Sequence, residues 1–375
     1  MNRTPTYLDY NSTTPLKPAV LALVCATLAE VGNASSVHGY GRAARKRVED
    51  ARAQVAALAG VKSTQVVFNS GATEGNNTVI KHFKGQRVLI SAIEHPSVRE
   101  SAPDAERIPV TADGIVDLAA LKAMLDNGPA PALVSVMMVN NEVGTIQPVA
   151  EIAKMVKDKG ALFHCDAVQA AGKMPLNMHQ TGADFMTLSA HKMGGPQGTG
   201  ALIIGPCGIA PHMISGGGQE KRQRAGTENI AGIAGMGRAA ELALAEMDQY
   251  IAVGALRDHL EAAMKATAPT MFVNGAGAPR SPNTANICLP GVDAQTMLMT
   301  LDLEGFAVGS GSACSSGTMK PSPVLLAMGV PEDRARSSLR ISLGWDTNAA
   351  DIDNFLQAWQ RLCARLLPLN KEATN

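Results

Sequence analysis

The chain has 375 residues, and its 33 lysines and arginines are balanced by 33 aspartates and glutamates, so the formal net charge at pH 7 is zero. A chain of this length exceeds the usual size of one hydrophobic core, and we expect two domains. The balanced charge supplies no field that would draw the protein to nucleic acid or to an anionic membrane. Small substrates or protein partners fit it better.

The cysteines and the N-terminus indicate a reducing compartment. Six cysteines lie far apart, without a C-x-x-C pair or a His/Cys cluster at zinc-like spacing: Cys25, Cys165, Cys207, Cys288, Cys314 and Cys363. We therefore expect neither a disulfide framework nor a metal site in the chain. Residues 1–7 carry no signal pattern, and no apolar run reaches the length of a membrane span. The sequence predicts a soluble, cytoplasmic protein with reduced thiols.

The N-terminal segment, residues 7–18, contains Asp9, Asn11, Thr13 and two prolines. Such residues bond their own backbone, so the sequence predicts an ordered turn segment that reaches a specific place. Helical apolar spacing follows over residues 19–31 and again over residues 42–59.

From residue 65 onward, short apolar runs alternate with helical patterns. We expect strands at residues 66–68, 87–90, 132–139, 161–166 and 185–188, with helices at 73–84, 118–125 and 149–159. Runs that are apolar on both faces and separated by crossover helices predict a mainly parallel sheet. A further run at residues 201–204 is assigned as an antiparallel edge strand.

The C-terminal third has a different composition. Residues 228–266 form a long alanine-rich helical stretch that we expect to be interrupted near Gly254 and to bridge two domains. The remainder predicts a smaller α+β domain, with strands at 284–289 and 338–343, helices at 294–303, 324–328 and 349–367, and a loop at 308–318.

Polar side chains recur where the predicted strands stop: Thr73, His95, Asn141, Asp166 and Lys192. In parallel sheets, ligands bind outside the carboxyl ends of the strands. We therefore expect these five side chains to converge on one site.

Three of the stretches fit a pyridoxal phosphate site, and each has a plainer interpretation. Lys192 is a candidate Schiff-base amine or an ordinary surface lysine. Asp166 is a candidate partner of a pyridinium nitrogen or a helix N-cap. Residues 70–74 form a turn into a helix N-terminus, which either binds phosphate or is an ordinary cap.

Three further residues carry their own alternatives. His95 is either a structural histidine or a ring that stacks on a planar cofactor and carries protons. Arg340 faces one side of a strand with Ser338 and Ser342, where it binds a substrate carboxylate or forms a structural ion pair. Cys314 lies among small residues in the loop at 308–318, as a nucleophile or as an accidental surface thiol.

With these motifs in view, the chain resembles the cysteine desulfurases of the class-V aminotransferase family, pyridoxal-phosphate fold type I, in particular the nitrogen-fixation and housekeeping iron–sulfur group. The matching stretches are residues 7–15, Gly32 and Asn33 with Ser36, His38 and Gly41, then 70–74, 94–95, 140–144, 166–169, 189–198, 224–229, 309–316 and 337–344. Each is weak alone, and their shared order makes the resemblance specific.

The resemblance implies an α/β fold with a mainly parallel seven-stranded sheet flanked by helices and a smaller α+β domain. The large domain would span residues 15–253, and residues 1–14 with 254–375 would form the small domain that carries the catalytic cysteine loop. The cofactor would be pyridoxal 5'-phosphate.

The resemblance also implies roles for single residues. Lys192 would be the Schiff-base lysine, Cys314 the persulfide-forming nucleophile and His95 the stacking residue. Cofactor contacts would come from Ala72, Thr73, Asn141, Asp166, Gln169, Ser189, His191 and Thr227, the last from the other subunit of a homodimer. Asn141 and Arg340 would bind the substrate carboxylate.

The implied reaction converts L-cysteine to L-alanine. The thiolate of Cys314 attacks the substrate sulfur, and the resulting persulfide passes sulfur to an acceptor such as an iron–sulfur scaffold protein. A selenocysteine lyase or an aminotransferase of the same fold is the alternative, and a scaffold without catalytic activity is a more remote one. An aminotransferase would not need Cys314.

Overall fold

The computed structural model describes residues 5–310 and 320–367. A seven-stranded sheet forms its centre, in the order β2-β8-β7-β6-β5-β3-β4. The strands are β2 (Val66–Asn69), β3 (Val88–Ser91), β4 (Glu106–Ile108), β5 (Leu133–Ser135), β6 (Leu162–Asp166), β7 (Phe185–Ser189) and β8 (Gly200–Ile204). The strands from β4 to β7 are mutually parallel, which confirms the predicted mainly parallel sheet.

The strand at residues 200–204 differs from its prediction in one respect. It is antiparallel, but it lies between β2 and β7 and pairs with both, so it is not an edge strand. The edge position is taken by β2. The apolar pattern of β8 could not reveal this, because all five of its residues are buried whichever neighbour it has.

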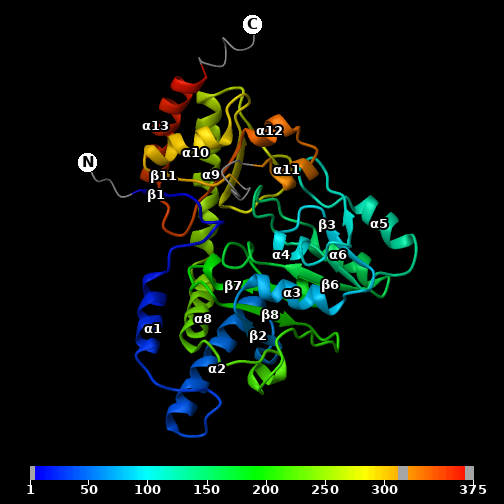
Figure 1. Ribbon diagram of the computed structural model, residues 1–375. Helices are drawn as coiled ribbons and strands as arrows, with labels where there is room; N and C mark the ends of the chain where they lie inside the picture. The colour runs from blue at the N-terminus through cyan, green and yellow to red at the C-terminus, as the bar shows by residue number, and fades with distance from the viewer. Residues whose placement is uncertain (1–4, 311–319, 368–375) are drawn as a thin grey trace.

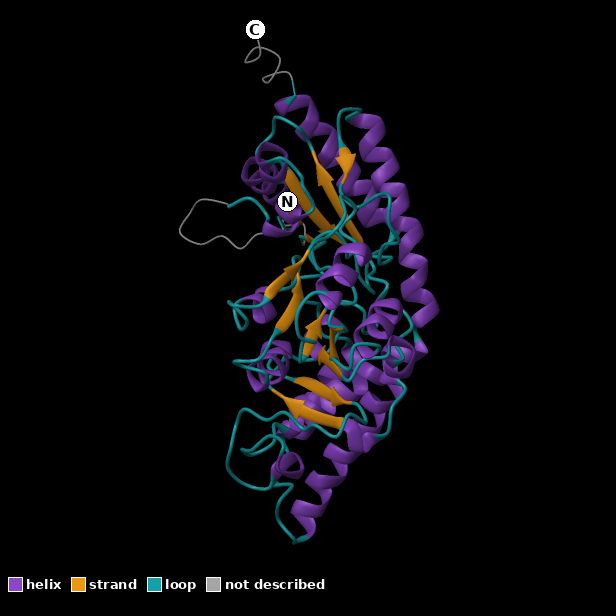
Figure 2. Cartoon of the chain, turned by 90° about the vertical axis from the view of Figure 1, so that its right-hand side faces the viewer, coloured by secondary structure: helices purple, strands orange, loops and turns teal. Residues whose placement is uncertain are grey.

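Helices cover both faces of the sheet (Figures 1 and 2). Along β7, Met186 and Leu188 face one core, whereas Phe185 faces the other. The first core is completed by α1 (Pro18–Leu28), α2 (Gly39–Ala59), α5 (Leu118–Asp126), α6 (Val149–Lys157) and α8 (Ile230–Ala245). The second is completed by α3 (Ala72–His82) and α4 (Pro96–Arg99). The period-2 alternation of strand side chains sets this two-sided burial.

The sequence predicted that the long helical stretch is interrupted near Gly254, but the interruption lies at Glu246. Helix α8 ends at Ala245, and α9 (Met247–Thr267) contains Gly254 in its interior. A glycine inside a helix only weakens helix propensity, so the packed helix continues through it. In Figure 1, α8 lies beside α1 and α2, and α9 rises from it to α10 and α13.

The second part of the molecule is α+β, as predicted. It contains an antiparallel sheet of β9 (Phe272–Val273), β10 (Thr284–Cys288) and β12 (Ser338–Ser342), and a parallel pair of β1 (Thr6–Tyr7) and β11 (Phe306–Ala307). Its helices are α9, α10 (Ala294–Leu303), α11 (Pro323–Ala327), α12 (Glu332–Arg336) and α13 (Ala349–Leu366).

Each part has its own hydrophobic core. The core around the large sheet's helix-rich face uses residues from Val20 to Ala243, and the core of the second part uses Leu8 and residues from Val253 to Cys363. The division into residues 15–253 and residues 1–14 with 254–375 stays a prediction.

Among the described helices, none combines the length and the apolar character needed to cross a membrane.

Candidate active site

One cavity collects most of the predicted site residues. Its volume is about 890 Å³, which is within the roughly 300–1,000 Å³ typical of small-molecule sites. Ten predicted residues line it: Ala72, Thr73, His95, Asn141, Asp166, Gln169, Ser189, His191, Lys192 and Arg340. The expected convergence of the strand ends is therefore observed.

Two predicted residues are placed differently. Thr227 lines a neighbouring hollow of about 170 Å³, which shares Ser70 and Gly198 with the main cavity. Cys314 lies outside the described residues, although Val308, Gly309 and Ser310, which precede it in the chain, line the main cavity.

Lys192 lies just past the end of β7, at the end of a 3-10 turn (Ala190–Lys192). Its Nζ donates to the backbone carbonyls of Asn11 and Ser12, both at 2.5 Å. Burial and, to a smaller extent, the Arg340 charge lower the pKa of Lys192 to about 8, against the opposing effects of Asp9 and Asp166. A substantial fraction of the amine is therefore neutral near physiological pH, the form that attacks a carbonyl carbon.

Asp166 is the last residue of β6, and its carboxylate is buried in the cavity wall. It accepts hydrogen bonds from Asn76 Nδ2 at 2.7 Å and from the Val168 backbone N–H at 3.0 Å. Turns, and no α-helix, follow it, so the N-cap interpretation does not apply. Within the described residues Asp166 forms no ion pair, and its charge is left for a cationic group in the cavity.

His95 caps the N-terminus of α4 and also lines the cavity. Its Nδ1 accepts from the Ser97 backbone N–H at 3.1 Å. The neutral ring therefore carries its proton on Nε2. Burial lowers the pKa of His95; Asp166 opposes this, and the Lys192 and Arg99 charges add to it.

The start of α3 offers an anion cradle. Gly71 occupies the N-cap with a φ of 145°, and no side chain within residues 5–310 and 320–367 caps the helix. The N–H groups of Ala72 and Thr73 stand in the first turn, where a helix has no internal acceptors. Ser70 does not act as the cap, because its backbone N–H and hydroxyl both donate to Glu74.

His191 and Ser189 complete the polar lining near the lysine. His191 Nδ1 lies 3.1 Å from Thr13 Oγ1. Burial, together with the Lys192 and Lys173 charges, lowers the pKa of His191 to about 4, so the ring is neutral at physiological pH. A neutral imidazole contributes hydrogen bonds to an anion without adding charge.

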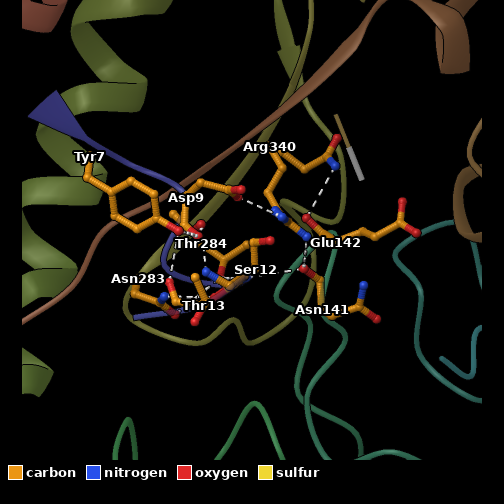
Figure 3. Close-up of polar contacts among 12 residues, drawn as sticks. Tyr7, Asp9, Ser12, Thr13, Asn141, Glu142, Asn283, Thr284 and Arg340 are labelled. Atoms are coloured by element: carbon orange, nitrogen blue, oxygen red, sulfur yellow. Dashed lines mark hydrogen bonds and ion pairs between the residues drawn. The ribbon is translucent and has the colours of Figure 1, made fainter. Parts of the chain in front are cut away.

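Arg340 meets a carboxylate within the protein. Its Nη2 lies 2.7 Å from Asp9 Oδ1, and its Nη1 donates to the Asn141 backbone oxygen at 3.0 Å. Figure 3 shows the Asp9 and Arg340 side chains directed at one another, beside Asn141. The Arg340 Nε is buried without a hydrogen-bond partner among the residues that the structure describes. The structural ion pair considered from the sequence is therefore present, and donors remain for a ligand.

Asn11 is a functional candidate that sequence reasoning missed. Its backbone oxygen accepts from Lys192 Nζ and from Gln169 Nε2, the latter at 3.0 Å. Its side chain bonds Lys173, Asn283, Thr284 and the Asn141 backbone. The ordered turn predicted for residues 7–18 thus reaches the cavity, where Asp9, Asn11, Ser12 and Thr13 form one wall. A polar turn segment was the signal, but its destination required the fold.

Comparison with known proteins places nearly the whole chain in one family. The aminotransferase class-V family model matches residues 6–355. A curated relative named cysteine desulfurase IscS, from Dictyoglomus turgidum, is 40% identical, with 96% of this chain and 95% of the relative covered. A cysteine desulfurase from Sinorhizobium fredii is 42% identical, with coverages of 94% and 95%.

Solved structures agree with the sequence relatives. A NifS-like protein from Rickettsia africae superimposes with a TM-score of 0.90 at 38% identity and covers 96% of this chain and 99% of its own. A structure described as SspA in complex with cysteine has a TM-score of 0.75 at 26% identity, with coverages of 90% and 98%.

Proposed function

Since the chain belongs to the class-V aminotransferase family, we propose that it is a pyridoxal phosphate-dependent cysteine desulfurase that converts L-cysteine to L-alanine and transfers the sulfur. The observation that carries this proposal is the single cavity that unites the Lys192 amine, the Asp166 carboxylate, the free N-terminus of α3 and Arg340. Those four features match the four charged or reactive groups of a pyridoxal phosphate–amino acid pair.

The residues present fit the cofactor. The uncapped first turn of α3 suits a phosphate, which Ser189, His191 and the Ala72 and Thr73 N–H groups would hold. Asp166, without an ionic partner among the described residues, would pair with a protonated ring nitrogen. Bound in this place, pyridoxal phosphate supplies an electron sink for the substrate Cα.

Three side chains would set the ring of the cofactor in place. Lys192 would be its covalent anchor, Gln169 would donate to its phenolic oxygen, and His95 would stack on it and exchange protons. The neutral state of His95 and its fixed Nδ1 acceptor bond leave the Nε2–H as the mobile proton of that ring.

The substrate carboxylate would bind between Asn141 and Arg340. Arg340 retains a buried Nε–H that no described residue accepts from, and further N–H groups beyond those that meet Asp9 and Asn141. A planar guanidinium presents paired donors to a carboxylate, which orients the amino acid as well as binding it. Once Lys192 is released from the cofactor, its amine, with a pKa of about 8, would accept the Cα proton.

Sulfur would leave through Cys314. Its thiolate would attack the substrate sulfur, so that the S–S bond forms as the substrate C–S bond breaks, and the electron pair of that bond would be protonated to give L-alanine. The persulfide would then pass to an acceptor protein, such as a scaffold for iron–sulfur cluster assembly. The cavity-lining positions of Val308, Gly309 and Ser310 support this role.

A homodimer would complete the site. Helix α1, the loop after it and the start of α2 expose large apolar side chains, among them Leu21, Leu28, Val31, Val37 and Tyr40, with exposed fractions of 48–84%. Exposed apolar surface of this kind marks a protein interface. Thr227 lies in the hollow beside the cavity, from where it would reach the cofactor of the partner subunit. We also place the protein in the cytoplasm, since the five described cysteines are free.

The reaction is tested by incubating purified holoenzyme with L-cysteine. The amount of L-alanine formed is quantified, and the sulfur adduct on the Cys314 peptide is measured by mass spectrometry. Cys314→Ala is expected to abolish both sulfide release and the adduct. Wild-type sulfide production by this variant would contradict the mechanism, and keto acid instead of alanine would favour an aminotransferase. If the purified protein shows no visible cofactor band, and Lys192→Ala does not change its absorption spectrum, the result would favour a non-catalytic scaffold.

A further inference from the structure

Lys173 is the one lysine whose side chain is fully enclosed in the described part of the chain, with 1% of its surface exposed. Its Nζ donates to Gln169 Oε1 at 2.5 Å and to Asn11 Oδ1 at 2.7 Å. Both acceptors are neutral amide oxygens, and no described carboxylate pairs with this amine. A lysine buried without a counter-ion is costly, so its place calls for a role other than stability.

The amine does not line the cavity, so it does not touch a bound cofactor or substrate. Burial, with the charges of Lys192 and Arg340, holds the pKa of Lys173 well below its usual range. A neutral amine still has two hydrogens, one for each of its two acceptors. The hydrogen bonds therefore persist whether or not the group is charged.

A protonated lysine can only donate, and in its neutral form Lys173 still directs one hydrogen at Gln169 Oε1 and one at Asn11 Oδ1. An amide, in contrast, presents either an oxygen or an NH₂ group depending on which way it is turned. Because Lys173 occupies the oxygen of Gln169, the NH₂ group must point the other way. There one N–H reaches the Asn11 backbone oxygen, which also accepts from Lys192 Nζ. The second N–H is left for the cavity that Gln169 lines.

We propose that Lys173 is a positioning residue that fixes the orientation of the Gln169 amide, so that a donor and never an acceptor faces the oxygen of a group linked to Lys192. This rests on the proposed function, in which Gln169 donates to the phenolic oxygen of pyridoxal phosphate. Asn11 also helps to orient this amide. Its side-chain oxygen accepts from Lys173 Nζ, and its backbone carbonyl accepts from Gln169 Nε2.

The orientation has a spectroscopic consequence. A donor at the phenolic oxygen stabilises its anionic form, so the proton shared between that oxygen and the lysine-linked nitrogen is released at a lower pH. Without Lys173 the amide can turn its oxygen toward the phenolic oxygen, and the proton is held to a higher pH. Loss of one hydrogen bond to a charged oxygen corresponds to a shift of about one pH unit or more.

The test is a pH titration of the visible absorption of the holoenzyme in the absence of substrate. Lys173→Met is expected to raise the midpoint by about one unit, whereas Lys154→Met, on the exposed face of α6, leaves it unchanged. Lys173→Gln restores an N–H donor and is expected to bring back part of the shift. An unchanged midpoint in Lys173→Met would overturn the proposal.

A double-mutant comparison isolates the route through Gln169. Gln169→Leu removes the donor itself, so adding Lys173→Met to it is expected to cause no further rise. A second rise of similar size would overturn the proposal, because Lys173 would then act by another path. If Lys173→Met alone does not fold, the comparison of Gln169→Leu with the double variant still tests the proposal, because leucine at position 169 leaves no amide oxygen unsatisfied.

The two proposals fail in different ways. A wild-type protein that acquires no visible band with pyridoxal phosphate contradicts the proposed function, and the inference falls with it. A wild-type protein with a normal band, whose midpoint Lys173→Met does not move, contradicts this inference alone.

Discussion

Two buried arginines in this molecule each pair with a carboxylate, and their surroundings differ. Arg52 and Glu220 form a two-pronged pair at 2.7 and 2.8 Å, and Arg52 also bonds the Val66 carbonyl. Glu220 in turn accepts from the Phe68 backbone N–H at 2.8 Å. This pair is saturated and ties the loop before α8 to α2 and β2.

The pair of Arg340 with Asp9 is not saturated. It is made by one nitrogen, the Arg340 Nε is buried without a partner in the described part of the chain, and both residues line the cavity. A polar group left unpaired in a protein interior costs stability and persists where a ligand completes it. The comparison indicates that Arg52 stabilises the fold, whereas Arg340 has donors available for a substrate.

The largest expected effect falls on the saturated pair. Glu220→Ala removes the buried counter-ion of Arg52 and leaves it only the exposed Glu49 at 3.2 Å, and we expect it to lower the free energy of unfolding by about 3 kcal/mol. Denaturant unfolding measures this. Glu332→Ala, which breaks the exposed pair with Arg336, is the control and should cost no more than about 0.5 kcal/mol. Equal losses of unfolding free energy in Glu220→Ala and Glu332→Ala would contradict the structural role of the Arg52–Glu220 pair.

Next to Arg340, Glu142 should make stability depend on pH. It is fully buried and accepts from Ser322 Oγ at 2.5 Å. Burial raises its pKa from 4.5 to about 7, against the opposing effects of Ser322 and of the Arg340 and Arg99 charges. The unfolded chain releases this proton near pH 4.5 and the folded protein near pH 7, so stability falls as pH rises between these values and is flat above them.

Glu142→Gln should remove this fall, because glutamine keeps an acceptor for Ser322 without a charge. The difference between variant and wild type should grow from pH 4.5 to pH 7 by on the order of 3 kcal/mol in favour of the variant. Unfolding at a series of pH values measures it. Glu151→Gln on the exposed side of α6 is the control, and an identical pH slope in wild type and Glu142→Gln would contradict the assignment.

Arg340→Gln tests the unsaturated arginine. Loss of a charge-assisted pair to the substrate carboxylate should raise KM for L-cysteine by about 100-fold. The matched control is Arg280→Gln, which breaks a largely buried pair with Glu261 away from the cavity and should leave KM unchanged. Similar KM values for Arg340→Gln and wild type would assign Arg340 to structure alone.

The smallest effect is expected for Asp9→Asn. The amide keeps an oxygen for Arg340 Nη2 and removes the competing carboxylate charge, so Arg340 stays oriented while its attraction for a carboxylate grows. We expect KM for L-cysteine to change by less than about tenfold, toward lower values. Asp9→Ala loses the contact that orients Arg340 and should raise KM. Steady-state kinetics of the two variants reveals whether the orientation of Arg340 or the charge of Asp9 has the larger effect on KM for L-cysteine.

Much of this arrangement could be predicted from the sequence. The alternation of apolar runs with helical patterns is a local property, and it located the parallel sheet and hence the strand ends where His95, Asp166 and Lys192 meet. The position of β8 inside the sheet and the helix break at Glu246 were not predictable, because pairing partners and helix packing are set by distant residues.

The polar network behind the site was equally hidden from the sequence. Lys173 is followed by Met174 and Pro175 in a stretch with no sign of its surroundings, and Asn11 was visible only as a turn residue. Asn11 lies more than 150 residues from Gln169 and Lys173 in the chain, and it meets them only after the N-terminal segment crosses to the sheet. Side-chain networks of this kind require the folded backbone.

The most direct test of the central claim uses the two lysines. Holoenzyme is treated with borohydride to make its link to pyridoxal phosphate permanent, then digested, and the modified peptide is identified by mass spectrometry. We expect the cofactor on Lys192, none on the enclosed Lys173, and no modified peptide from Lys192→Ala. A cofactor linked to Lys173 or to any other lysine, or a visible band that survives Lys192→Ala, would contradict the account.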